Sequence, residues 1–478
     1  MQELPVEILI KIFKLAASNQ NLMFVCHRFY KIICEMEKYQ HILNISNENL
    51  LLNTKTFSSI ITSERKIDSI KLIVNMNYQF EFWQRLEAVI LKFRDKIKIL
   101  DITILQAAHN SSQLMNILHL LPQNCPKELK LNQCQLSTFA RFLSHRDIEK
   151  LTIIRSIDDH TAFYNLNLTE LSLIGPRCDV TKIVKTQRNL KHLRIVGDDN
   201  FYIDESILDL PHIESLDIPL FEINTITGTE LIEKIHNLSS LKSLNFQSIA
   251  SFAQKFCNSL IFPNIEDLDI SILNELVTEN SFDKLHENFP NLKSFSIRTG
   301  MALKVFRHLC LNSKINFESL LIENIHFGFV GITILPSIEF DIQQRGIKKL
   351  VLINRDRKII ICKNDLQKCL KLFPNLEYLV ISGHFDTHTL LENLLKSMTK
   401  LKELVIVANG SHSTTYTMGV IKEYGTKLRL IVLENYQSAC DVENLKIFFD
   451  GQFDVIIKRN LNLVFKEMGK IELKEFIC

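Results

Sequence analysis

The feature that most constrains the fold of this chain is a short apolar pattern that recurs along nearly all of its 478 residues. In each copy an apolar residue is followed three residues later by Leu and, after one more residue, by Leu or Ile, as in Ile148-x-x-Leu151-x-Ile153. The fourth positions of successive copies, from Leu43 to Ile431, are about 20 to 30 residues apart, with a mean of about 26. Chance gives one or two copies in a chain rich in Leu and Ile, whereas so long a series requires a repeated structural unit.

Each copy predicts one short strand, because alternate side chains of a strand point to the same face. The segments between the copies have helical periodicity: residues 227–238 place Leu231 and Ile235 on one face, and residues 281–289 and 390–401 are similar. A unit of strand, turn and helix cannot bury both of its faces alone. Neighbouring units are therefore expected to stack into a solenoid.

A second phrase precedes three of the predicted strands, where a helix returns to the next strand. It reads Phe-Pro-Asn followed by Ile or Leu, at residues 262–265, 289–292 and 373–376. Proline cannot continue a helix, and the residue before it prefers an extended backbone. The phrase therefore predicts where the helix of a unit ends and the next strand begins.

One unit, Leu129-x-Leu131-x-x-Cys134, has the spacing of a cysteine-type leucine-rich repeat. Together with the recurring strand pattern, these residues resemble the leucine-rich repeat family. The resemblance implies an α/β fold, namely a leucine-rich repeat solenoid (horseshoe) of roughly 16 degenerate repeats that occupies residues 41–478.

The charge and glycine content of the chain indicate which kinds of molecule it is expected to bind. The chain has 56 Lys and Arg against 54 Asp and Glu, a net charge of +2, whereas dedicated nucleic-acid binders have a strong basic excess. Only 13 residues are Gly, and no glycine-rich phosphate loop is present. We therefore expect a protein partner, no nucleic acid and no cofactor.

The cysteines and the first residues of the sequence indicate the cellular compartment in which we expect the protein. Eleven cysteines are scattered without a C-x-x-C pair or a zinc-ligand spacing, which favours reduced thiols and no metal site. Charged residues such as Glu3, Glu7 and Lys11 interrupt the first apolar stretch, so it does not read as a signal peptide. No apolar stretch is long enough to span a bilayer. We expect a cytoplasmic or nuclear protein, or one present in both, without a membrane partner.

Catalytic motifs do not appear in the sequence. The chain lacks G-x-G-x-x-G, G-x-x-x-x-G-K-[ST], H-E-x-x-H and G-x-S-x-G, and its 15 His residues are too scattered to single out a catalytic set. We expect a non-catalytic protein. A hydrolase or transferase with an unrecognised site is the alternative from the enzyme class.

The first forty residues do not follow the repeat. They read as two short apolar helices, the first beginning with Pro5, which suits the first turn of a helix. Ile8 and Ile12 share one face, as do Val25 and Phe29. A hairpin of about 40 residues is marginal as a free domain, so a partner surface is the natural complement.

This segment also resembles an F-box, with LPxEI and IF followed after a gap by VCxxFY. The resemblance covers residues 3 to about 40, so we assign residues 1–40 to an all-α F-box hairpin ahead of the array. In that family the motif binds the Skp adaptor of a cullin–RING ubiquitin ligase. The alternative is that the same side chains form only the core of the hairpin. By the resemblance, the adaptor-binding residues are Leu4, Pro5, Ile8, Phe13, Leu22, Val25, Cys26 and Phe29.

Substrate-binding residues are predicted from the strand pattern, because residues between the inward positions of a strand face the concave side of the solenoid. From Leu321 onward these positions are unusually apolar, and exposed apolar patches often mark recognition surfaces. The alternative is that a loop at 327–346 or the C-terminal tail covers them. The candidates are Arg298, Leu321, Glu323, Val351, Ile353, Val380, Val405 and Val407.

The resemblance and the repeats together predict a substrate-recognition subunit of a Skp–cullin–F-box ubiquitin ligase. Its F-box would bind the Skp adaptor, and the concave face of the repeats would bind an unidentified protein substrate. The alternative is a leucine-rich repeat scaffold that binds proteins without any link to ubiquitin.

Overall fold

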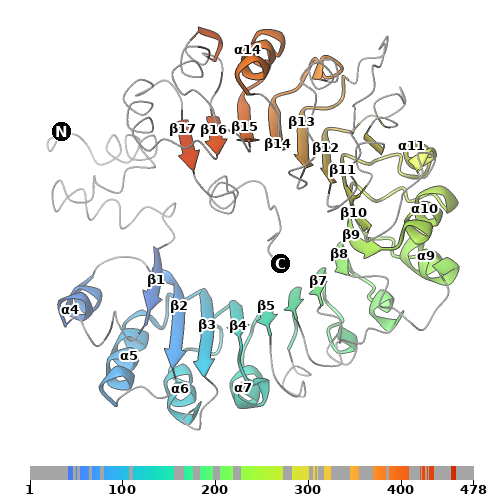
Figure 1. Cartoon of the computed structure of the whole chain (residues 1–478). Helices are drawn as coiled ribbons and strands as arrows, with labels where there is room; N and C mark the ends of the chain where they lie inside the picture. Colours follow the sequence, from blue (N-terminus) through green and yellow to red (C-terminus); the bar gives the residue numbers. More distant parts are fainter. Residues whose placement is uncertain are drawn as a thin grey trace, which may run out of the picture. The chain divides into compact units, whose positions relative to one another are not determined.

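The structure is a computed structural model (Figure 1). It describes residues 41–46, 50, 54–63, 67–75, 80–106, 111–155, 166–175, 184–197, 205–218, 228–272, 282–300, 305–306, 309, 317–324, 345–354, 370–383, 387–408, 420, 423–425, 428, 430–434 and 454–458. The chain forms two compact units, Met1–Ile226 and Thr227–Cys478. We call them the N-terminal unit and the C-terminal unit and describe each by itself.

Among its described residues, the N-terminal unit has eight strands that pair in chain order, each parallel to the next. Its helices lie on one side of the strands (Figure 1). The strands are β1 (His41–Ile45), β2 (Ile67–Asn75), β3 (Ile99–Gln106), β4 (Glu128–Asn132), β5 (Lys150–Ile154), β6 (Glu170–Ile174), β7 (His192–Val196) and β8 (Ser215–Ile218). The helices are α4 (Thr54–Thr62), α5 (Phe80–Phe93), α6 (Ser111–Leu118), α7 (Leu136–Leu143) and the 3-10 helix η3 (Glu205–Asp209).

The C-terminal unit repeats this arrangement with nine described strands, again parallel and paired in chain order. They are β9 (Ser243–Ser248), β10 (Asp267–Ile272), β11 (Ser294–Thr299), β12 (Ser319–Asn324), β13 (Lys349–Asn354), β14 (Tyr378–Gly383), β15 (Glu403–Ala408), β16 (Leu430–Glu434) and β17 (Asp454–Lys458). The helices among its described residues are α9 (Gly228–His236), α10 (Ala250–Ser259), α11 (Leu285–Asn288) and α14 (Thr387–Ser397).

The strands confirm the repeat pattern. Every predicted copy has a strand. In β4 burial alternates as the pattern predicts, because the inward Leu129 and Leu131 are fully buried and Lys130 between them is partly exposed. The helices also match the prediction, although α11 is only four residues long. In α9, Leu231 and Ile235 are buried on one face, as their spacing predicts.

The Phe-Pro-Asn phrase holds neighbouring repeats together through two of its side chains. The rings of Phe262 and Phe289 stack with their centroids 5.1 Å apart and their planes 11° apart. The Asn291 side-chain amide donates a hydrogen bond of 2.8 Å to the carbonyl oxygen of Pro263, one repeat earlier. Asn264 and Asn375 make the same bond to the carbonyls of Ser239 and Arg345. The phrase therefore links repeats as well as ending helices.

Charged residues of alternating sign stand immediately before strands β9 to β15 of the C-terminal unit, and we call this series the rim ladder. Neighbours in it form ion pairs, with 2.5 Å between Lys293 Nζ and Glu266 Oε2 and 3.5 Å between Lys348 Nζ and Glu318 Oε1. Their backbones are linked too, because the N–H groups of Lys348 and Lys349 both donate to the carbonyl of Glu318. In chain order the rim ladder is Lys242, Glu266, Lys293, Glu318, Lys348, Glu377 and Lys402.

Three successive strands of the N-terminal unit end in the same backbone turn. The residues that follow β4, β5 and β6 are Gln133, Arg155 and Gly175, with φ of 56°, 51° and 57°. Each donates its N–H to the last carbonyl of the next strand, at 2.8, 2.8 and 2.7 Å. The left-handed conformation therefore turns the chain away from the sheet while keeping one more link between repeats.

The predicted F-box, residues 1–40, lies outside the described residues. Among those that the structure describes, no helix has the length and apolar character needed to cross a membrane.

Candidate functional site: the open face of the sheet

The face of each sheet that points away from the helices is formed by the strand positions between the buried ones, and we call it the open face. In the C-terminal unit, the outward side chains of the open face change from polar on the earlier strands to apolar on the later ones. The middle positions of β9, β10 and β11 are Asn245, Asp269 and Ser296, whereas those of β13 and β14 are Val351 and Val380. The polar and apolar parts meet between β11 and β13.

An ion-pair cluster lies where the two parts meet. The guanidinium of Arg298 on β11 binds both carboxylate oxygens of Asp269 on β10, at 2.6 and 2.8 Å. Its Nε lies 3.2 Å from Oε2 of Glu323 on β12, a side chain with no exposed surface. Two of the predicted substrate-binding residues, Arg298 and Glu323, are therefore brought together. They contact each other and Asp269, which was not among the candidates.

The predicted apolar positions are present but not open to solvent. Val351, Val380 and Val405 are at most 1% exposed, and Ile353 is 8% exposed. These four residues therefore do not form an exposed stripe, and their burial agrees with the alternative that other parts of the chain cover them. Leu321 on β12 remains partly exposed.

Val407 belongs to β15, but its side chain is outside the described part. The substrate-binding role of the whole candidate set remains a prediction.

Two polar side chains beside this apolar region are affected by its burial. Lys349 on β13 has its ammonium 5.3 Å from the ring centroid of Tyr378 on β14. Burial lowers the pKa of Lys349, with Glu403 acting in the opposite direction. Burial also raises the pKa of the Tyr378 hydroxyl, and the nearby Glu403 carboxylate adds to that effect. Both shifts follow from the limited access of solvent to this end of the open face.

The open face of the N-terminal unit keeps its contact with solvent. Its last outward positions on β5, β6 and β7 are Ile154, Ile174 and Val196, which we call the aliphatic row. Ile154 and Ile174 are partly exposed, and Val196 is 39% exposed. The strand pattern predicts outward positions for these three residues, but the polar Thr152, Ser172 and Arg194 beside them make this part of the open face look polar in the sequence.

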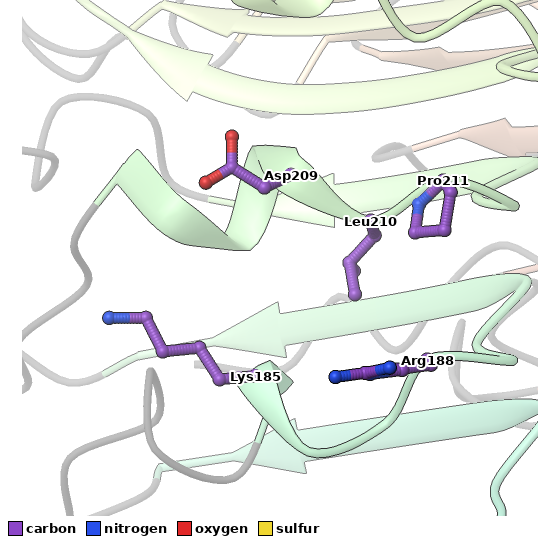
Figure 2. Close-up of a pocket in the computed structure, with 5 residues that line it drawn as sticks. All are labelled: Lys185, Arg188, Asp209, Leu210 and Pro211. Atoms are coloured by element: carbon purple, nitrogen blue, oxygen red, sulfur yellow. The ribbon is translucent and has the colours of Figure 1, made fainter.

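A pocket of about 290 Å³ lies elsewhere in the N-terminal unit (Figure 2). Lys185 and Arg188, which precede β7, form one side, and Asp209, Leu210 and Pro211 form the other (Figure 2). Both cationic side chains belong to exposed residues, and a carboxylate lies opposite them. Exposed charges in water contribute little to binding, so this arrangement favours a solvated surface over a built anion site.

The described residues offer little for metal or thiol chemistry. Within the ranges given above, no three His, Cys, Asp or Glu side chains are placed to hold a metal ion. The free cysteines among them are Cys125, Cys134 and Cys257, of which the last two are buried. Burial raises the pKa of Cys134 to about 12, far from the range of a reactive thiolate.

The predicted adaptor-binding residues, from Leu4 to Phe29, all lie outside the described residues. Their role stays a prediction, as does the expectation that the chain is not an enzyme.

Comparison with known proteins gives matches only among solved structures, because no family model and no curated protein matches the sequence. One match is the TLR13–ssRNA13 complex, at 14% identity over 89% of this chain and 67% of the matched chain, with a TM-score of 0.33. A second is the yeast complex of Rad7 and Elc1, at 12% identity over 85% and 89%, with a TM-score of 0.36. A third is the mouse RP105/MD-1 complex, at 13% identity over 82% and 75%, with a TM-score of 0.37.

The fold follows from the chain's own features: a repeated sequence unit, one parallel strand from each repeat, and helices on one side of the sheet. Both units are therefore leucine-rich repeat solenoids, whose open faces are the candidate binding surfaces.

Proposed function

We propose that this chain recruits a protein substrate to a cullin–RING ubiquitin ligase. The F-box-like residues 1–40 bind the Skp adaptor, and the open face of the repeats binds the substrate. The observation that carries the proposal is the order of the sequence, in which LPxEI, IF and VCxxFY stand immediately ahead of a leucine-rich repeat array. Each part alone is common, whereas the two in this order are typical of one class of F-box protein.

The mechanism is proximity. A substrate held on the open face experiences a raised effective concentration of the ubiquitin-carrying enzyme, because both are bound to the same assembly. Such a subunit needs no catalytic residue of its own. The substrate, the adaptor and the cullin are then the partners of the chain.

The test is binding of purified Skp adaptor to the full-length chain. We expect the wild type to bind and the double variant Phe13→Ala, Val25→Asp to lose binding, since it removes one apolar contact and places a charge at another. The matched control in the same segment is Lys14→Ala, a polar change that keeps binding. Circular dichroism shows whether the array remains folded in each variant. A wild-type chain that does not bind the adaptor would overturn the proposal.

A scaffold unrelated to ubiquitin is the second candidate. What supports it is the repeat fold itself, in which each described strand adds to the open face of its unit, whereas the F-box rests on a resemblance in sequence. It predicts a protein partner that binds the array in the presence and absence of residues 1–40, together with no binding of the Skp adaptor.

A further inference from the structure

One row of the open face in the C-terminal unit keeps its contact with solvent beside a covered region. The first outward positions of β12, β13, β14 and β15 pair in register from strand to strand. All four are partly exposed, whereas the next outward positions on β13, β14 and β15 are at most 1% exposed. A partner can therefore reach this part of the open face at the first positions, which we call the first row: Ser319, Lys349, Tyr378 and Glu403.

Two neighbouring side chains of the first row are hydrogen-bond donors that lack an acceptor among the described residues. The hydroxyl oxygen of Tyr378 is buried, and no described residue hydrogen-bonds to it. The ammonium of Lys349 lies 5.3 Å from the centroid of the Tyr378 ring, and a ring face attracts a cation without accepting its N–H groups as a carboxylate does. Buried polar groups of folded proteins usually have a partner, so the missing acceptor marks this pair as a binding site for one.

The charges around Lys349 leave its ammonium without a near counter-ion. Glu403 lies two strands away, with Tyr378 between them in register. Burial lowers the pKa of Lys349 despite the opposing effect of Glu403, so that carboxylate does not make up for the lost hydration of the ammonium. On β12 and directly before β12 and β14, the described carboxylates already face other cations, in the pairs Glu323–Arg298, Glu318–Lys348 and Glu377–Lys402.

An acidic group on the partner fits these features better than other ligands. A cation would meet the ammonium of Lys349 and the exposed Arg345, four residues earlier in the chain. A phosphate typically binds several cations or backbone N–H groups, whereas the first row offers one ammonium and one hydroxyl, with the Glu403 carboxylate beyond them. One carboxylate has two oxygens, enough to accept from both Lys349 and Tyr378.

The first row is open on both sides to a segment that crosses the strands. Ser319 continues it beyond Lys349, and Glu403 continues it beyond Tyr378. Both residues are partly exposed, so a bound segment need not end at the site. Leu321 on β12 is also partly exposed and offers the segment an apolar contact. These features favour an acidic side chain within a segment over a C-terminal carboxylate.

We propose that Lys349 and Tyr378 bind the carboxylate of an Asp or Glu side chain carried by the partner protein. The Tyr378 hydroxyl donates to one oxygen, and the ammonium of Lys349 donates to the other and supplies the opposite charge. Ser319 and Leu321 contact the rest of the segment. The inference deepens the proposed function and rests on it in one respect, that the open face binds a protein.

The experiment presents the full-length chain with three synthetic peptide libraries on beads. The first has Glu at the centre of random residues that include no other acid, and its C-terminus is an amide. The second is the same with Gln in place of Glu. The third has no acidic side chain and ends in a free carboxylate. We expect the Glu library to be enriched over the other two, because it alone presents an acidic side chain.

Two variants assign the binding to the proposed site. We expect the enriched Glu peptide to bind at least about tenfold more weakly to Lys349→Met and about fivefold more weakly to Tyr378→Phe. The matched control is Lys348→Met, the adjacent lysine in the rim ladder, which leaves the affinity unchanged. Tyr378→Phe also tests the missing acceptor: the free variant should melt at the same or a higher temperature than the wild type, because a buried hydroxyl without a partner is removed.

Each outcome decides the question. Equal enrichment of the Glu and Gln libraries, enrichment of the third library alone, enrichment of none, or Glu-peptide binding that both variants leave intact would overturn the proposal. So would a Tyr378→Phe variant that melts clearly below the wild type, since the hydroxyl would then have an acceptor within the chain. Circular dichroism shows whether Lys349→Met is folded, and Tyr378→Phe decides if it is not. Adaptor binding is a separate readout, so its absence with Glu-peptide binding retained would overturn the ubiquitin-ligase proposal alone.

Discussion

Arg298 binds both carboxylate oxygens of Asp269 while its Nε faces the fully buried carboxylate of Glu323. One guanidinium thus lies between two carboxylates on three neighbouring strands. Planar, bidentate contacts of this kind are among the stronger hydrogen bonds in proteins. The cluster fixes the relation of three repeats at the point where the open face changes from polar to apolar.

Replacing Arg298 should destabilise the folded chain more than replacing Asp269, one of its two carboxylate partners. We expect Arg298→Met to lower the free energy of unfolding by about 3–5 kcal/mol, because it leaves the carboxylates of Asp269 on β10 and Glu323 on β12 without the guanidinium between them. Asp269→Asn keeps the Arg298–Glu323 pair and should lower the free energy of unfolding by about 1 kcal/mol. Urea unfolding followed by circular dichroism compares the two variants.

A second substitution tests the reason for that difference. Adding Glu323→Gln to Arg298→Met removes a buried charge and should recover part of the lost stability. Equal losses for Arg298→Met and Asp269→Asn, or a further loss in the double variant, would contradict this account of the cluster.

The left-handed turns after the strands predict opposite effects at equivalent positions. Gly175 adopts its positive φ without steric cost, so Gly175→Ala should destabilise the chain by about 1 kcal/mol. Arg155 adopts the same backbone with a Cβ, so Arg155→Gly should be neutral or stabilising by up to about 1 kcal/mol. Thermal unfolding of the two variants beside the wild type measures the difference. A stabilising Gly175→Ala would show that the turn is not under this constraint.

The Asn of the Phe-Pro-Asn phrase should stabilise the array through its hydrogen bond to the previous repeat. Asn291→Ala removes the 2.8 Å bond to the Pro263 carbonyl and should cost about 0.5–1.5 kcal/mol. A comparison variant is Asn189→Ala, whose amide also reaches the preceding repeat but binds a side chain, that of Asn167, rather than a backbone carbonyl. Denaturant midpoints for the two variants should rank with Asn291→Ala lower. The reverse ranking would argue against a linking role for the phrase.

Stability should fall in alkaline solution because of buried thiols. Burial raises the pKa of Cys134 from its ordinary value of 9.0 to about 12, so the folded state holds a proton that the unfolded state loses. Its contribution is complete below about pH 9 and is lost as the pH rises toward 12, at no more than about 1.4 kcal/mol per pH unit for one group.

The slope of unfolding free energy between pH 9 and 11 measures this effect. Cys134→Ala should make the slope shallower, even though it lowers stability at neutral pH by removing packed atoms. Labelling with iodoacetamide at pH 8 gives an independent check by peptide mapping. Modification of Cys134 in the folded chain before Cys125, the partly exposed thiol, would contradict the burial argument.

The strands could be predicted from sequence because each depends on a local pattern. Within one repeat, Leu129 and Leu131 point to the same face of the strand. Each further repeat carries the same local pattern, so no long-range information is needed to predict its strand. The turns at Gln133 and Arg155 could not be predicted, because neither residue is Gly and the left-handed backbone is set by a hydrogen bond to the next strand. The helical segments were predicted as elements, but the shortness of α11 was not.

Side-chain contacts and burial in the candidate site are harder to predict from local sequence patterns than the strands are. Arg298 and Glu323 occupy equivalent positions of neighbouring repeats, so aligning the repeats by register was a signal that could have revealed their pairing. The burial of Val351 and Val380 could not be read from their strands, since a strand pattern gives the direction of a side chain and not what lies against it. Exposure on an open face depends on the rest of the chain.

The alternating charges of the rim ladder distinguish even from odd changes in the number of its repeats. Each repeat enters its strand with either a cation or an anion, and each kind has the other kind as its neighbour from Lys242 to Lys402. Losing the single repeat that begins at Glu266 would set Lys242 beside Lys293, and like charges on adjacent strands repel. Losing two consecutive repeats would restore the alternation. The alternation of this part of the chain is therefore kept when two consecutive repeats are lost or gained together and is broken when one is.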